Sequence, residues 1–203
     1  MDAATLLIAA AVIATVILIR CLMRKLRVGQ LYSRPVLITG CDMGLGYDLA
    51  LGLCKLGVPV FATCLTASGA KKLKAEAEER KLDGREQFWT VQMDVTDEDS
   101  SRKVLAFVKE KVGDKGLWGV VCNAGILGYP VVDDWLTPDV YSSVLGVNLL
   151  GTIRTCQLFK PLLLQQRGRL VFLSSMLGSF AAPALGPYCV SKFGVEAYAN
   201  VNR

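Results

Sequence analysis

Apolar and polar positions follow a regular order along most of this chain. From residue 34 onward, short apolar runs rich in β-branched residues alternate with longer stretches that have helical spacing. The runs predict strands over 35–39, 58–63, 88–93, 117–121 and 170–173. The stretches predict helices over 47–56, 97–112 and, with interruptions, 139–166. Strands that alternate with helices predict an α/β fold built on a parallel sheet.

The N-terminal segment has a different pattern. Residues 3–19 form an unbroken apolar run, and residues 21–23 extend it beyond Arg20, so it approaches the roughly 20 residues that span a bilayer. Neither a cleaved signal peptide, which carries positive charge before its apolar region, nor an arginine-rich transit peptide fits as well. Basic residues follow the run, which places the next domain on the cytoplasmic side. We expect a membrane anchor with its basic flank over 1–30 and a folded domain over 31–203.

Composition narrows the chemistry of that domain. The net charge of +5 comes with no basic and aromatic platform, so no nucleic acid is expected as a partner. Seven cysteines without a C-x-x-C pair suggest free thiols in a reducing compartment. The 203 residues include no histidine, which excludes Ser-His-Asp and Cys-His nucleophile systems within this chain and any histidine-ligated metal. No metal site is expected.

A glycine-rich turn joins the first predicted strand to its helix. Thr39 is followed by the spacing Gly-x-x-x-Gly-x-Gly, which ends at Gly46. Glycines at such a turn let the backbone approach a pyrophosphate, which the helix N-terminus then stabilises. The spacing alone also suits a tight turn, but its strand-turn-helix context favours a dinucleotide. The candidate cofactor contacts here are Thr39, Gly40, Asp42, Met43, Gly44, Leu45 and Gly46.

The ends of the next three strands add further candidates. Cys64 ends the second strand, where an acid would favour NAD and a basic residue NADP; neither is present, so NAD is expected and NADP is less favoured. Asp94 and Val95 end the third strand and could contact adenine, although Asp94 could equally cap the next helix. Small residues after the fourth strand leave room for a ligand: Asn123, Ala124 and Gly125.

A proton-transfer group is suggested in the last third of the chain. Tyr188 and Lys192 are spaced i, i+4 on a helix that Pro187 can open, so their side chains share one face. A nearby ammonium favours the tyrosine anion and lowers its pKa, and Ser175 lies at the preceding strand end. The alternative is an ordinary half-exposed helix. Asn148, in the middle of a predicted helix, either is satisfied in the core or holds a water near the site.

Together these segments resemble the short-chain dehydrogenase/reductase family from residue 34 to the C-terminus. That resemblance implies a Rossmann-type doubly wound sheet. It also implies Tyr188 as general acid/base, Lys192 as pKa modifier and nicotinamide-ribose ligand, and Ser175 as the group that orients the alcohol or carbonyl. Asn148 would support a proton-relay water. Hydride would pass between the substrate carbon and the nicotinamide.

Finer motifs resemble the membrane-associated retinol and hydroxysteroid branch of the family. They include the segments 40–46, 64–70, 116–119 and 188–197. The branch implies a small lipophilic alcohol or ketone, a retinoid or steroid, as substrate, and an endoplasmic reticulum membrane location. The segments 174–178 and 187–189 are also similar to 3-hydroxybutyrate dehydrogenase, which is the alternative.

Two departures from the family pattern matter. Cys122 stands where the family usually has an asparagine, so one polar contact that supports the central sheet is expected to change. The chain also stops inside the predicted catalytic helix, which implies a sheet incomplete at its C-terminal side and a fragment or truncated isoform. Relatives form subunit contacts through the helices around Asn148 and Tyr188. The resemblance therefore leaves open a homodimer, or an inactive chain that binds or regulates an intact subunit.

Overall fold

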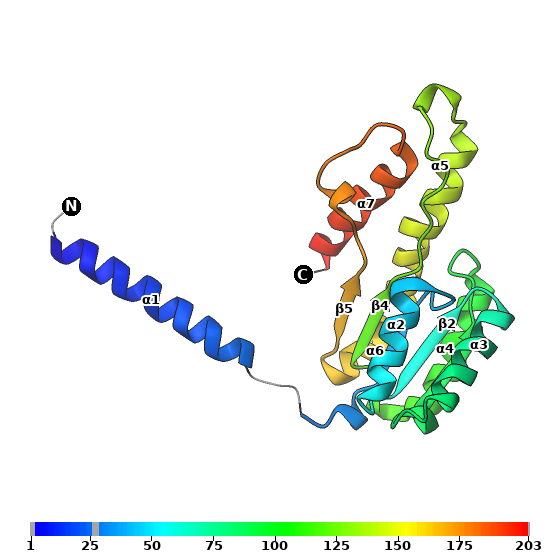
Figure 1. Ribbon diagram of the computed structural model, residues 1–203, viewed down its shortest axis with the longest axis horizontal. Coiled ribbons are helices and arrows are strands. Elements are labelled where there is room, and N and C mark those ends of the chain that lie inside the picture. The colour runs from blue at the N-terminus through cyan, green and yellow to red at the C-terminus, as the bar shows by residue number, and fades with distance from the viewer. Residues whose placement is uncertain (1–2, 26–28, 203) are drawn as a thin grey trace. The chain divides into compact units, whose positions relative to one another are not determined.

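The computed structural model describes residues 3–25 and 29–202, and the chain divides into two compact units, Met1–Leu31 and Tyr32–Arg203. The first unit contains helix α1 (Ala3–Lys25), drawn in dark blue in Figure 1. Within it, Thr5–Met23 has a mean hydropathy of 2.7 and no buried residues. By length and composition, this helix is able to cross a membrane.

The second unit is built on one sheet of five parallel strands in the order β3-β2-β1-β4-β5. The strands are β1 (Val36–Ile38), β2 (Val60–Cys64), β3 (Phe88–Gln92), β4 (Gly119–Cys122) and β5 (Arg169–Phe172). Leu37 is in register with Phe61 on one side and Val120 on the other. Since strand order reverses between β1 and β4, the crevice at their carboxyl ends is the topological switch point at which doubly wound sheets bind ligands. The predicted fold class is confirmed.

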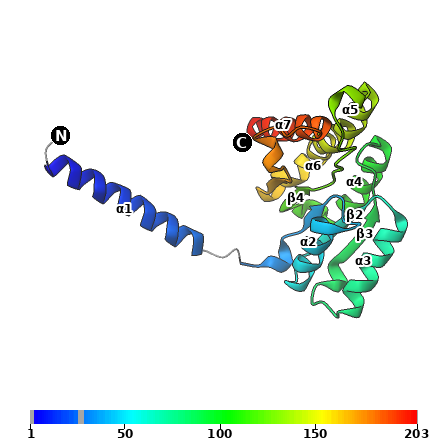
Figure 2. The ribbon, with the colours of Figure 1, turned by 45° about the horizontal axis from the view of Figure 1, so that its top comes forward.

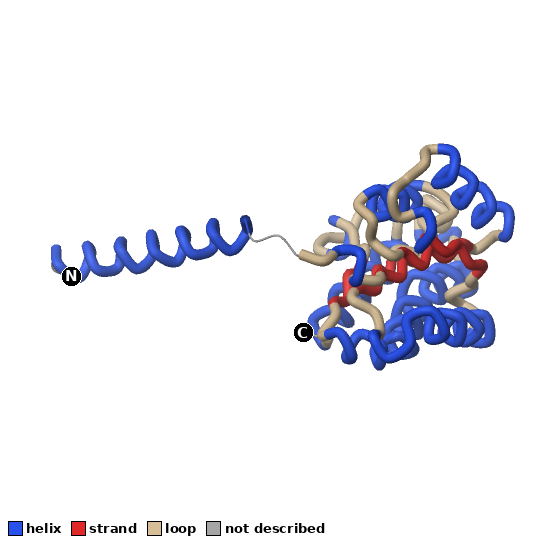
Figure 3. The backbone as a smooth tube through the Cα atoms, turned by 90° about the horizontal axis from the view of Figure 1, so that it is seen from below, coloured by secondary structure: helices blue, strands red, loops and turns tan. Residues whose placement is uncertain are grey.

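Helices cover both faces of the sheet, as Figures 2 and 3 show. They are α2 (Gly44–Lys55), α3 (Ala67–Glu79), α4 (Glu98–Val112), α5 (Pro138–Leu145), α6 (Thr152–Gln166) and α7 (Gly186–Val201). Right-handed crossovers place α2 and α3 on one face and α4 and α6 on the other. A core cluster on the second face buries Phe61, Val108 and Phe159 completely. These predicted strands and helices begin and end within a few residues of the observed ones.

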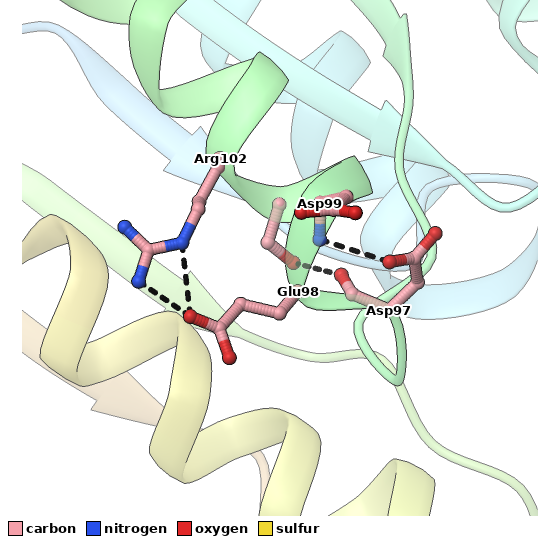
Figure 4. A network of polar contacts seen from close by, with 5 residues as sticks. Asp97, Glu98, Asp99 and Arg102 are labelled. Carbon is pink, nitrogen blue, oxygen red and sulfur yellow. Dashed lines mark hydrogen bonds and ion pairs between the residues drawn. The ribbon is translucent and has the colours of Figure 1, made fainter.

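Helix α4 shows how local chemistry sets where an element begins (Figure 4). The Asp97 carboxylate caps the helix by accepting the backbone N–H of Asp99 at 2.9 Å. One turn on, Arg102 Nε donates to Glu98 Oε1 at 2.9 Å across the i, i+4 spacing. The cap of this helix is therefore Asp97, and the alternative in which Asp94 caps it is wrong.

The cysteine in place of the family's usual asparagine packs against another thiol. Cys122 Sγ lies 3.5 Å from Cys156 Sγ, and both residues are buried between β4 and α6. The neighbouring Cys156 thiol and burial raise the pKa of Cys122, so the thiol stays protonated. The predicted change at position 122 therefore takes the form of a thiol–thiol contact that joins β4 to α6.

Candidate active site

A cavity of about 970 Å³ opens at the carboxyl edge of the sheet. Its size lies within the range of about 300–1,000 Å³ that ligand pockets occupy. Residues after β1, β2, β3 and β4 form its walls, so it lies at the switch point. Nine predicted cofactor contacts line it: Gly40, Asp42, Met43, Leu45, Asp94, Val95, Asn123, Ala124 and Gly125. The other predicted cofactor contacts, Thr39, Gly44, Gly46, Cys64, Tyr188 and Lys192, are outside this lining.

The glycines of the turn after β1 leave its backbone free of side-chain atoms and also allow the turn to pack closely against neighbouring residues. Gly40 has φ +70°, and a Cβ there would lie 2.7 Å from the Cα of Ala124. At Gly46, a Cβ would lie 2.4 Å from Asn123 Nδ2. The turn therefore packs directly against the end of β4. At the start of α2, the N-cap Met43 makes no side-chain cap hydrogen bond, so the first N–H groups of that helix remain available to an anion.

Thr39 and Asn123 lock the ends of β1 and β4 together. The Thr39 hydroxyl accepts the backbone N–H groups of Asn123 and Ala124, each at 3.0 Å. In return, the Asn123 side-chain amide donates to the carbonyls of Thr39 at 2.8 Å and Gly40 at 2.9 Å. Thr39 is buried, so its role in this structure is to fix the edge of the crevice rather than to face the cavity.

The Asp42 carboxylate holds the loop that follows β2. Its Oδ2 accepts the N–H of Leu65 at 2.7 Å, and its Oδ1 accepts the N–H and hydroxyl of Thr66 at 3.0 and 2.8 Å. A negative charge thus lines the cavity beside the end of β2, where the residues at the strand end itself carry none. Cys64 lies behind this loop, and burial, with Asp42 nearby, raises the pKa of its thiol to about 12.

Asp94 closes the turn between β3 and α4. Its Oδ1 accepts the backbone N–H and the hydroxyl of Thr96, at 2.8 and 2.7 Å. The backbone N–H of Asp94 donates to Ser100 Oγ at 3.0 Å. This turn presents Asp94, Val95 and Thr96 to the cavity.

Asn148 lies in a π-helical turn, Gly146–Gly151, that interrupts the helix between α5 and α6. Such turns are frequent at functional sites. The residue is 1% exposed, and both its amide oxygen and its amide nitrogen are hydrogen-bonded. Its Oδ1 accepts the Ile126 N–H at 2.8 Å, while Nδ2 donates to the Ile126 carbonyl and to Ser191 Oγ, each at 2.9 Å. The expected interruption is therefore a specific turn that aims Asn148 at the loop after β4.

Lys192 is buried beside Tyr188 on α7. Its Nζ donates to the carbonyl of Leu173 at 2.6 Å and lies 5.5 Å from the centroid of the Tyr188 ring. Because the lysine is only 5% exposed, desolvation lowers the pKa of its ammonium group. Ser175 lies three residues after β5 and caps the 3-10 turn Met176–Gly178, where its hydroxyl accepts the Leu177 N–H at 3.2 Å. The predicted helical face is present, and Ser175 is in the loop after the strand rather than at its end.

Gly125 connects the cavity to this second group of residues. It lines the cavity, and a Cβ built on it would lie 3.3 Å from Asn148 Oδ1 and 3.7 Å from Lys192 Nζ. The absence of a side chain at position 125 therefore brings the lysine and asparagine up to the cavity wall. The structure therefore brings Lys192 and Asn148 next to Gly125 at the switch point, while Tyr188 and Ser175 are outside the cavity lining.

Sequence reasoning missed Ser191. Its hydroxyl accepts a hydrogen bond from Asn148 and donates one to the Tyr188 carbonyl at 2.7 Å, so it links the π-helical turn to α7. The sequence did carry a signal for this residue, because Ser191 is three residues after Tyr188 and a serine hydroxyl in a helix can donate to a backbone carbonyl three or four residues earlier. Thr66 and Lys72, which line the cavity, were missed because their approach depends on how Asp42 holds the loop after β2.

Comparisons with known proteins agree with this geometry. A family model described as short chain dehydrogenase matches residues 34–203. The solved structure of an alcohol dehydrogenase from the archaeon Thermococcus sibiricus, complexed with 5-hydroxy-NADP, superposes with a TM-score of 0.75 at 25% identity. That match covers 83% of this chain and 69% of the other.

Three relatives are more similar in sequence. The chain is 43% identical to human 17-beta-hydroxysteroid dehydrogenase type 6, over 87% of this chain and 53% of the relative. It is 45% identical to mouse retinol dehydrogenase 5, over 81% and 49%. It is 42% identical to rat mitochondrial D-beta-hydroxybutyrate dehydrogenase, over 84% and 49%. The chain therefore spans about half the length of these relatives.

Proposed function

The chain belongs to the short-chain dehydrogenase family, and we propose that it forms the cofactor-binding and proton-transfer part of an NAD(P)-dependent oxidoreductase that interconverts an alcohol and its carbonyl. The observation that carries this proposal is the position of Gly125, which brings Lys192 and Asn148 to the wall of a dinucleotide-sized cavity. A retinoid or hydroxysteroid is the proposed substrate, because relatives that act on these compounds by name are among the most similar.

The cavity fits a dinucleotide in three respects. Glycine at position 40 keeps the turn after β1 free of side-chain atoms, and the first N–H groups of α2 lack a side-chain cap. The end of β4 adds small residues, Ala124 and Gly125, on the opposite wall. When bound, the nicotinamide would accept or donate the hydride. Asn123 would act indirectly, by holding the turn in place.

The proton would move at the Tyr188 hydroxyl. During oxidation, the alcohol oxygen would lose its proton to Tyr188 as the substrate carbon loses hydride; reduction reverses both transfers. The ammonium of Lys192 lies 5.5 Å from the centroid of this tyrosine ring. Ser175 would hold the substrate oxygen. Asn148 and Ser191 would hold α7 in place against the loop after β4.

NAD is the proposed cofactor. Asp42 is in the turn after β1, and its carboxylate lies beside the end of β2, where it would repel the additional phosphate of NADP. Lys72 also lines the cavity and is the nearest favourable charge for that phosphate. The Asp42 carboxylate is fixed in place by three hydrogen bonds to the loop after β2, whereas Lys72 is on the first turns of α3. We therefore assign the preference for NAD over NADP to Asp42.

The proposed location is the endoplasmic reticulum membrane, with the second unit in the cytoplasm. Support comes from the apolar helix over Thr5–Met23 and from the basic residues that follow it. A membrane anchor suits a lipid-soluble substrate. Protease protection of the chain in microsomes tests the orientation: digestion of the second unit without detergent supports it, and full protection contradicts it.

We also propose a homodimer that uses α7. Val190 and Phe193 are 49% and 43% exposed on this helix, and Leu150 is 52% exposed in the π-helical turn. Burial of such side chains against a second copy would stabilise the pair. Sedimentation of the detergent-solubilised chain tests this: we expect a dimer that F193E dissociates, and a monomer would contradict it.

An NADH titration of the full chain in detergent, with NADPH alongside, tests cofactor binding. We expect saturable binding that is tighter for NADH. Turnover of retinol, a hydroxysteroid and 3-hydroxybutyrate then tests the chemistry: Tyr188→Phe should lower turnover about 10²–10⁴-fold and leave NADH affinity unchanged. Failure of the folded chain to bind either cofactor would overturn the proposal. Turnover of hydroxybutyrate alone would replace the lipid substrate with the alternative one.

A further inference from the structure

A basic and aromatic surface, which the sequence pattern alone did not reveal, lies at the edge of the sheet opposite the cavity, where strands begin. The guanidinium groups of Arg34 and Arg169 both lie over the Trp118 ring, 5.6 and 5.5 Å from its centroid. Backbone bonds fix this arrangement, because Trp118 donates to the Pro35 carbonyl at 2.8 Å and accepts from Arg169 at 2.9 Å. Two cations are thus held around one ring, which favours an anion beside them.

A second, smaller cavity of about 290 Å³ opens beside the same edge. Tyr32, Lys111 and Lys115 are among the residues that line it. Phe61 and Trp89 add an aromatic wall, with their rings stacked at 4.6 Å. The lysines give this edge of the sheet positive charge, and the aromatic rings give it side chains of the kind found at membrane–water interfaces.

These residues define what we call the basal surface: Tyr32, Arg34, Lys111, Lys115, Arg167 and Arg169. It contains five basic residues, and the same segments carry two carboxylates: Glu110, whose Oε1 lies 3.0 Å from Lys111 Nζ, and Asp114. The surface therefore has a net positive charge. It also exposes apolar groups, since Tyr32 is 68% exposed and Leu164, one turn from Arg167, is 70% exposed.

The basal surface includes Tyr32, the first residue of the second unit. That helix ends at Lys25, and seven peptide units lead from there to Tyr32. A fully extended chain of this length reaches at most about 25 Å. The connecting segment itself includes Arg27. If α1 spans a bilayer, the basal surface is tethered close to its headgroups.

We propose that the basal surface docks on anionic phospholipid headgroups of the membrane that holds α1. This inference rests on the proposed anchor. Arginine and lysine bind the phosphate and carboxylate groups of such lipids, while Tyr32 and Leu164 enter the interfacial layer. Docking by this edge turns the carboxyl edge of the sheet toward water, so the dinucleotide cavity opens to the aqueous phase from which a soluble cofactor arrives.

A fluorescent probe at position 164 tests the docking. In Leu164→Cys, an environment-sensitive dye is attached to the full chain, reconstituted in nanodiscs of phosphatidylcholine alone or with phosphatidylserine. Labelling is selective, because the six cysteines of the second unit are buried and Cys21 lies in the proposed span. We expect blue-shifted emission, and quenching by spin-labelled lipid, only in the mixed bilayer. The same dye at Asp99→Cys, at the opposite edge, should remain in water.

Charge reversal provides the matched control. The double variant R167E/R169E should lower the docked fraction by about tenfold or more, since each basic side chain near an anionic surface contributes several-fold. The single reversal K103E, on the exposed side of α4, should leave the docked fraction unchanged. Circular dichroism melting shows whether each variant is folded.

Two results would overturn the docking. One is identical emission from position 164 in the two bilayers, and the other is a folded R167E/R169E variant that still docks. Flotation of the chain with vesicles after a high-salt wash reports the anchor separately. A chain that floats while position 164 stays in water rejects the docking alone, and a chain that does not float rejects the anchor as well.

Discussion

Asn148 holds the backbone of Ile126 from both sides, with Oδ1 on its N–H at 2.8 Å and Nδ2 on its carbonyl at 2.9 Å. One buried amide thereby satisfies a loop residue that has no strand partner there. The same amide reaches Ser191, so a single side chain ties the loop after β4 to α7. The positions of Gly125 and Lys192 depend on this connection.

Removal of that amide should destabilise the fold. Asn148→Ala removes two hydrogen bonds to the Ile126 backbone and one to Ser191, and each such bond contributes about 0.5–1.5 kcal/mol. We expect the free energy of unfolding to fall by about 2–4 kcal/mol in urea titrations. Asn200→Ala, on the exposed side of α7, is the control and should change it by under about 0.5 kcal/mol. An equal loss of stability in the two variants would contradict a specific structural role for the Asn148 amide.

Two glycines in α2 should respond in opposite ways to the same substitution. Gly46→Ala places a Cβ 2.4 Å from Asn123 Nδ2, so we expect a loss of about 2 kcal/mol or more in stability together with weaker NADH binding. Gly52→Ala meets no atom within 4 Å and should stabilise the helix by about 0.5–1 kcal/mol. Thermal melts and NADH titrations of the pair measure both effects. A tolerated Gly46→Ala would contradict the packing argument.

Asp42 should set the preference between cofactors. Asp42→Asn removes the charge from the cavity wall but keeps an oxygen for the loop after β2. Loss of one carboxylate near a phosphate is worth about 1 kcal/mol, so the ratio of NADPH to NADH dissociation constants should fall about five- to tenfold. Fluorescence titration with both cofactors measures the ratio. Asp48→Asn, exposed on α2, should leave it unchanged; an unchanged ratio in Asp42→Asn would remove Asp42 from cofactor selection.

Lys192 should give stability a distinct pH dependence. Burial lowers its pKa from the ordinary value of 10.5, so between the two values the unfolded chain binds more protons than the folded one. The free energy of unfolding contributed by this group must therefore rise with pH through that window, and the cost of the buried charge is greatest below it. Urea unfolding of the wild-type chain and Lys192→Met between about pH 8 and 11 measures the difference. Parallel curves would contradict the buried ammonium.

Local sequence was enough to determine the elements of this protein. Apolar runs of four to six residues form the strands, because β1, β2 and β4 are buried on both faces of a parallel sheet and the edge strands β3 and β5 are partly buried; helical spacing marks the segments between them. Gly40 and the Tyr188/Lys192 spacing were also readable, because positive φ and i, i+4 geometry are properties of a few consecutive residues.

What only the tertiary structure decided is how distant segments meet. No local pattern reveals that Asp42 reaches Leu65 and Thr66, that Asn148 holds Ile126, or that Arg34 and Arg169 share the Trp118 ring. These contacts join residues 22 to 135 positions apart in the chain. They arise from strand order and crossover packing, and so the carboxylate beside the cavity and the basal surface became visible only when the sheet was assembled.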